Sequence, residues 1–141
     1  MHKHKYLSIL IALLFLGCSE DPSVKERLLG TWVSDAELSS ESVMDSKIMN
    51  HQQKEYLKKT FGVYQYVFTK LSATYSMVNG DPKDNVYFGW KVLKDGDDKV
   101  VIEISGSFSR TEKVEFIRKK NCIGIYNYKY DYAEYFCRDK G

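Results

Sequence analysis

The stretch Leu28-Leu29-Gly30-Thr31-Trp32-Val33 marks where the folded part of the chain begins. Gly30 has no Cβ and lets the backbone turn sharply into an extended segment. Trp32, one of only two tryptophans in the chain, lies in that segment. We expect residues 31–34 to form the first strand of a small antiparallel barrel, onto which the downstream segments close.

Downstream of Val63 the hydrophobic period is two, which is the period of a half-buried strand. Asn79-Gly80-Asp81-Pro82 and Asp95-Gly96 are strong turn signals between the alternating segments. Short links between consecutive strands favour an up-and-down meander, and closing the meander into a barrel removes exposed edges. The expected fold is therefore mainly β, an antiparallel up-and-down barrel of about eight strands. The expected strands are 31–34, 63–69, 71–77, 86–93, 100–104, 113–116, 122–128 and 133–138.

One helix is expected between the first and second strands, over residues 39–61. Apolar residues from Met44 to Phe61 recur at spacings close to one helical face. Ser42, with Asp45 three residues later, resembles a capping box and predicts the start of this helix.

The first 17 residues have the pattern of an export signal. A short basic segment, 1–6, precedes an uncharged apolar run, 7–17, which is too short to span a bilayer. Leu14-Phe15-Leu16-Gly17-Cys18 resembles the lipobox of bacterial lipoproteins, whose cysteine becomes the lipidated first residue of the mature chain. An ordinary signal peptide with an incidental cysteine is the alternative.

The lipoprotein resemblance implies a signal peptide at 1–17; the polar segment 18–26 is expected to be a tether, and the strand pattern predicts a barrel domain at 27–141. The lipoprotein resemblance also implies attachment to a membrane through acyl chains on Cys18. Ser19 stands where an aspartate would resemble an inner-membrane retention signal. We therefore expect an address in the bacterial cell envelope, at the outer membrane, with the domain in the periplasm or at the cell surface.

Three cysteines are an odd number for an exported chain, which normally pairs its thiols. With Cys18 assigned to lipid, Cys122 and Cys137 remain as one pair in an oxidising compartment. Their disulfide would join the two strands of the final hairpin. Two free thiols are the alternative.

The charge balance and the histidine content exclude several classes of function. The chain has 21 Lys and Arg against 19 Asp and Glu, and removing residues 1–17 takes away Lys3 and Lys5, which leaves 19 against 19. A neutral chain without a basic block lacks the positive surface that nucleic acid requires. His51 is the only histidine beyond the signal, so histidine-based nucleophilic triads and metal sites are not expected. We expect that the chain is not an enzyme and that it holds no metal and no cofactor.

Gly30 and Trp32 form a Gly-x-Trp pair near the start of an all-β chain, which resembles the opening motif of the lipocalins and their calycin relatives. In that family the tryptophan plugs one end of the barrel and packs against an arginine from the last strand. The resemblance assigns that role to Arg138, and it covers most of residues 24–138. The chain differs from lipocalins in carrying its main helix after the first strand.

Aromatic residues are abundant, with 11 Tyr, 7 Phe and 2 Trp. Such side chains suit strands and fill a small barrel, but they also line cavities, where a hydroxyl on an apolar ring can hold an amphipathic ligand. The leading hypothesis is a non-enzymatic, lipid-anchored protein that binds a small apolar or amphipathic molecule. Its expected lining residues are Tyr64, Tyr66, Phe68, Tyr75, Phe88 and Trp90.

The segment Ser105-Gly106-Ser107-Phe108-Ser109-Arg110 supports an alternative. A loop of this composition is similar to those that periplasmic lysozyme inhibitors present to an enzyme. Ser107, Ser109 and Arg110 would then contact an envelope protein, and the chain would be an inhibitor or immunity protein. Two further alternatives stay open. The segment is an ordinary solvated hairpin turn, or the chain is a structural envelope protein without a discrete ligand.

Overall fold

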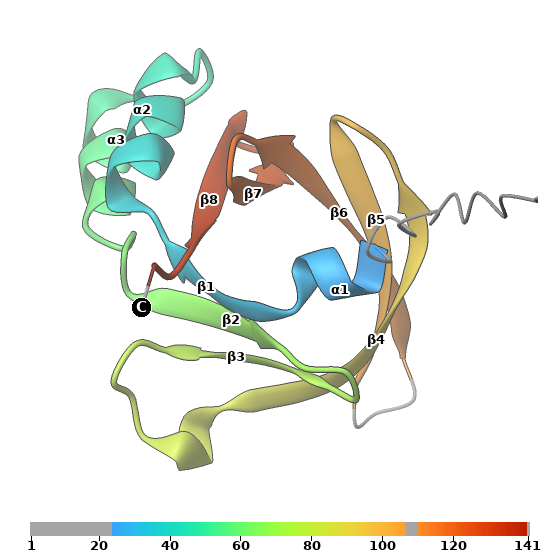
Figure 1. Ribbon diagram of the computed structural model, residues 1–141. Coiled ribbons are helices and arrows are strands. Elements are labelled where there is room, and N and C mark those ends of the chain that lie inside the picture. Colours follow the sequence, from blue (N-terminus) through green and yellow to red (C-terminus); the bar gives the residue numbers. More distant parts are fainter. Residues whose placement is uncertain (1–23, 107–109, 141) are drawn as a thin grey trace, which may run out of the picture.

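The structure, a computed structural model, describes residues 24–106 and 110–140, which form a closed barrel of eight antiparallel strands (Figure 1). Each strand pairs with the next along the chain, and the last pairs with the first. The expected up-and-down barrel and the helical insertion between its first two strands are confirmed. The elements are α1 (Val24–Leu28), β1 (Gly30–Ser34), α2 (Ala36–Asp45), α3 (His51–Lys58), β2 (Tyr64–Phe68), β3 (Ala73–Met77), η1 (Pro82–Asp84), β4 (Val86–Asp95), β5 (Lys99–Ser105), β6 (Thr111–Lys119), β7 (Cys122–Asn127) and β8 (Tyr132–Arg138).

The barrel closes where β1 meets β8, with Val33 opposite Cys137 and Ser34 opposite Phe136. Alternation then places every second side chain inside. The core contains Trp32, Phe68, Trp90, Phe116 and Phe136, each almost fully buried. The inward face therefore follows the predicted period of two.

The helical insertion consists of two helices rather than the single helix expected over 39–61. α2 begins earlier, because Asp35 caps it by accepting a hydrogen bond from the Leu38 amide at 2.9 Å. α3 has its own capping box, in which Asn50 and Gln53 each accept from the other's backbone amide. The expected capping box at Ser42 and Asp45 is wrong, since both residues lie within α2.

α2 covers the part of β8 that extends beyond β1. The Ser39 Oγ accepts from the Tyr135 amide at 2.9 Å, and the Ser42 Oγ accepts from the Ala133 amide at 2.8 Å. Two serines one turn apart on a helix thus satisfy backbone donors that a neighbouring strand would otherwise bind. This arrangement allows β1 to be short while β8 stays hydrogen-bonded on that side.

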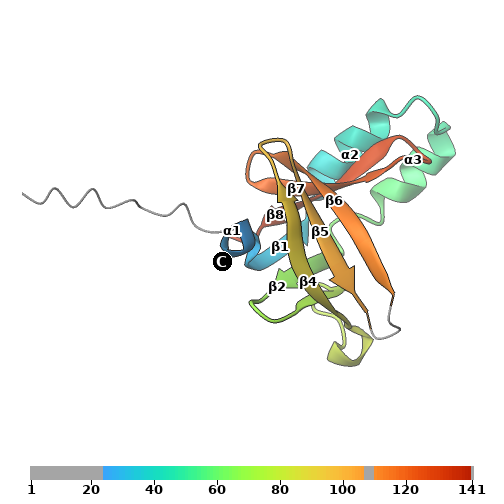
Figure 2. The ribbon, with the colours of Figure 1, turned by 90° about the vertical axis from the view of Figure 1, so that its right-hand side faces the viewer.

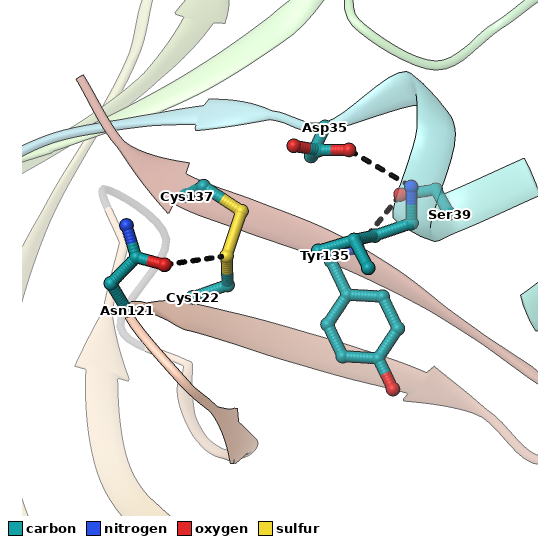
Figure 3. The surroundings of a disulfide bond; sticks show 7 residues. Asp35, Ser39, Asn121, Cys122, Tyr135 and Cys137 are labelled. Atoms are coloured by element: carbon teal, nitrogen blue, oxygen red, sulfur yellow. Dashed lines mark hydrogen bonds between the residues drawn. A yellow bond between two sulfur atoms is a disulfide. The ribbon is translucent and has the colours of Figure 1, made fainter. Parts of the chain in front are cut away.

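A disulfide joins Cys122 of β7 to Cys137 of β8, which lie directly opposite each other (Figure 3). The bond lies on the outside of the barrel beside Ser39 and Tyr135, next to the start of α2 (Figure 3). The pairing expected from the cysteine count is therefore present. It joins the two strands of the β7–β8 hairpin close to the point where β8 pairs with β1.

Candidate functional site

The two ends of the barrel differ, and α1 covers one of them (Figure 1). Leu28 at the end of α1 is fully buried, so this helix belongs to the folded domain. The last three residues of the expected tether, 24–26, are therefore helical. Cys18 and the expected signal at 1–17 lie outside the described residues.

The Gly30–Trp32–Arg138 group lies at this covered end. The Arg138 guanidinium lies 4.5 Å from the centre of the Trp32 ring and donates to the Leu29 carbonyl at 2.9 Å and to the Arg27 carbonyl. Gly30 has φ +116°, and a Cβ there would come within 3.3 Å of the Arg138 Nη1. Both the backbone angle and the close approach of the arginine therefore favour glycine.

Asp95 holds α1 to the barrel wall at the same end. Its two carboxylate oxygens accept from Arg27 of α1 and from Arg118 of β6, each at 2.6 Å. Trp32 also donates from Nε1 to the Leu28 carbonyl at 2.9 Å, which satisfies an acceptor at the end of the helix. This end of the barrel is closed.

The opposite end holds a cavity of about 340 Å³ between β4, β5 and β6. We call it the mouth cavity. Its lining is mostly apolar, and its two charged residues, Arg110 and Glu112, are exposed to solvent and so lie at its edge. The lining residues are Val86, Tyr87, Phe88, Ile104, Gly106, Arg110 and Glu112.

The six aromatic residues expected to line a ligand site all belong to the interior. Of these six, Phe88 borders the mouth cavity. The other five do not line it, and one of them, Tyr66, lies at the centre of a cluster of rings. Its ring lies within 4.8–6.4 Å, centre to centre, of the rings of Tyr75, Phe136, Phe68, Phe116 and Phe88.

The loop expected to contact a partner protein is described only at its ends. Ser107 and Ser109 lie outside the described residues. Arg110 is exposed and lies at the edge of the mouth cavity, so this side chain is available to a ligand in the cavity.

Glu134 is an inward-facing carboxylate that the sequence interpretation missed. It lies on β8 in phase with Phe136, and its Oε1 accepts from the Ser34 hydroxyl at 2.7 Å. Ser34 in turn accepts from the Gly62 amide at 3.0 Å. The period of two would have revealed Glu134, because it places residues 134, 136 and 138 on one face of the strand.

Burial raises the pKa of Glu134 above its ordinary value of 4.5, and the hydrogen bond from Ser34 opposes part of that rise. Burial, and then the charges of Tyr75 and Glu134, raise the pKa of Tyr66. Burial followed by the charge of Glu134 raises the pKa of Tyr75 to about 12. The same two causes, in the same order, raise the pKa of Tyr132. The charge of Glu134 therefore disfavours ionisation of all three tyrosines.

We expect Glu134→Gln to remove a pH-dependent loss of stability. A carboxyl whose pKa is higher in the folded state favours folding at low pH. Its contribution is lost as the pH rises from below 4.5 through the raised pKa. Urea unfolding at about pH 4 and about pH 8 measures the change. The wild-type free energy of unfolding should fall relative to that of the variant as the pH rises, and an unchanged difference would contradict the burial of this charge.

A second hollow of about 380 Å³ lies outside the barrel, between α3 and the β7–β8 turn. It contains Met49, Tyr56, Leu57 and Tyr130. Because it belongs to the helical insertion, it is separate from the mouth cavity. We call it the α3 hollow.

Comparisons with protein-family models, curated proteins and solved structures found no match. Within the described ranges, no group of three or more His, Cys, Asp or Glu side chains is placed to hold a metal ion. None of the helices described is long and apolar enough to cross a membrane.

Proposed function

We propose that this chain is a binding protein that holds the apolar part of a small amphipathic molecule in the mouth cavity. The observation that carries the proposal is a hollow of about 340 Å³ at one end of a barrel whose other end is closed by α1 and Trp32. Its volume lies at the small end of the range of about 300–1,000 Å³ for ligand pockets. Phe88 and Ile104 offer apolar contact, while Arg110 and Glu112 at the edge offer polar contact.

We also propose that the chain is exported and anchored by lipid on Cys18, as its resemblance to lipoproteins implies. The Cys122–Cys137 disulfide supports an oxidising compartment, where such bonds persist. In Figure 2, α1 lies on the left, away from the lower ends of β5 and β6, which border the mouth cavity. An anchor preceding α1 would therefore leave the mouth free to meet a ligand.

Gly106→Phe tests the mouth cavity. A Cβ at Gly106 meets no atom within 4 Å, so the new ring has room to occupy the hollow without displacing the backbone. The neutral probe N-phenyl-1-naphthylamine, whose fluorescence rises in apolar surroundings, is expected to bind the wild type and to lose on the order of tenfold in affinity in the variant.

Lys94→Phe is the matched control, because it adds the same ring at an exposed position near the closed end of the barrel. We expect its affinity for the probe to equal that of the wild type. Unchanged binding by Gly106→Phe, or no binding by the wild type, would contradict the proposed function.

A further inference from the structure

Glu134 faces the barrel interior, and no cationic side chain in the described part of the chain forms a salt bridge with it. The salt bridges found among residues 24–106 and 110–140 all lie elsewhere. Its carboxylate accepts one hydrogen bond from a side chain, that of Ser34. Burying a charge is costly unless it is paired, so this position carries an electrostatic cost that the Ser34 hydrogen bond offsets only in part. A ligand that supplied a positive charge would offset it.

Tyr64 and Tyr66 lie on β2 and Tyr75 lies on β3, the two strands that follow β1, whose Ser34 binds this carboxylate. The rings of Tyr66 and Tyr75 lie 4.8 Å apart, and those of Tyr64 and Tyr75 are stacked at 5.1 Å. All three side chains and Glu134 are only partly buried, so solvent reaches this group. The face of an aromatic ring attracts a cation, and a carboxylate accepts charge-assisted hydrogen bonds from an ammonium group. Both kinds of group therefore suit a positively charged amine.

This group adjoins the mouth cavity. From ring centre to ring centre, Tyr66 lies 4.8 Å from Tyr75 and 6.4 Å from Phe88, and Phe88 lines the cavity. Three charged side chains described at the mouth end of the barrel are in phase with the inward-facing residues. Arg110 is positive, while Glu112 and Glu134 are negative. One positive charge against two leaves an excess of one negative charge, which favours a cationic ligand.

We propose that Glu134, with Tyr64, Tyr66 and Tyr75, selects ligands with a positively charged amine head group, whose apolar tail occupies the mouth cavity. This inference rests on the proposed function and names the chemical class of its ligand. Ser34 and Gly62 act as positioning residues, since their hydrogen bonds fix the carboxylate.

Three probes with the same eight-carbon chain test the inference: octylammonium, octyl sulfate and octan-1-ol. By isothermal titration calorimetry at about pH 7.5, we expect the wild type to bind octylammonium on the order of tenfold more tightly than octyl sulfate. Glu134→Gln should bring the two affinities close together while leaving that for octan-1-ol unchanged. Glu115→Gln is the control, because it removes an equal charge that pairs with Lys99 at 3.1 Å on the outer face of the barrel.

The pH dependence of the wild type is a second measurement that needs no variant. Ser34 of β1 donates a hydrogen bond to the carboxylate, and the charge of Glu134 raises the pKa of Tyr66 of β2, Tyr75 of β3 and Tyr132 of β8. The tyrosines stay neutral in the acid range, so octylammonium affinity should fall as the pH drops through the pKa of Glu134, while octan-1-ol affinity stays constant.

Equal affinity for the cation and the anion, or a loss in Glu115→Gln equal to that in Glu134→Gln, would overturn the inference and leave the proposed function standing. Failure of all three probes to bind would overturn both.

Discussion

Trp32→Ala is expected to lower the free energy of unfolding by about 3–5 kcal/mol, the usual cost of truncating a buried aromatic side chain. Trp32 is 3% exposed and plugs the closed end of the barrel. Its loss leaves a cavity beneath α1 and removes the donor to the Leu28 carbonyl. It also removes the ring on which the Arg138 guanidinium rests at 4.5 Å.

Urea unfolding, followed by circular dichroism, measures this effect. Tyr128→Ala is the control, since this residue is 77% exposed and the substitution is expected to change stability by less than about 0.5 kcal/mol. A loss below about 1 kcal/mol in Trp32→Ala would show that the end of the barrel is not held by this side chain.

Removing the disulfide is expected to cost about 3 kcal/mol. The two cysteines are 15 residues apart, and in the chain-entropy account a crosslink over a loop of that length stabilises by about that amount. The consequence extends beyond the hairpin, because Cys137 also stands opposite Val33 where the barrel closes. Loss of the crosslink therefore loosens the strand on which closure depends.

The wild type, unfolded in urea with and without dithiothreitol, measures the contribution. The double variant Cys122→Ala and Cys137→Ala should match the reduced wild type and should not respond to the reductant. Equal stability of the oxidised and reduced wild type would contradict the stabilising role of this bond.

The barrel and its inward face were predictable from sequence because strand alternation is a local signal. The period of two from Tyr64 to Phe68 places the aromatic rings inside, where the structure has them. The break between α2 and α3 also has a local signal that the prediction missed. Asn50 and Gln53 carry the three-residue spacing of a capping box and start a new helix after Ser46.

The mouth cavity was not predictable in the same way. Some inward side chains fill the interior and others border a void. The difference depends on how rings from different strands pack, as those of Tyr66 and Phe88 do at 6.4 Å. Gly106 contributes to the void by lacking a side chain, which strand periodicity does not reveal. Glu134 was overlooked because a single charged residue in a strand is ordinarily assigned to the outer face.

The most direct test of the account locates a bound amphipathic molecule. An isotope-filtered NOESY spectrum of the labelled protein with unlabelled octylammonium reports which side chains lie against the ligand. We predict contacts from the octyl chain to Val86, Phe88 and Ile104 in the mouth cavity. Contacts confined to Met49 and Leu57 in the α3 hollow would contradict the claim that the barrel mouth is the binding site.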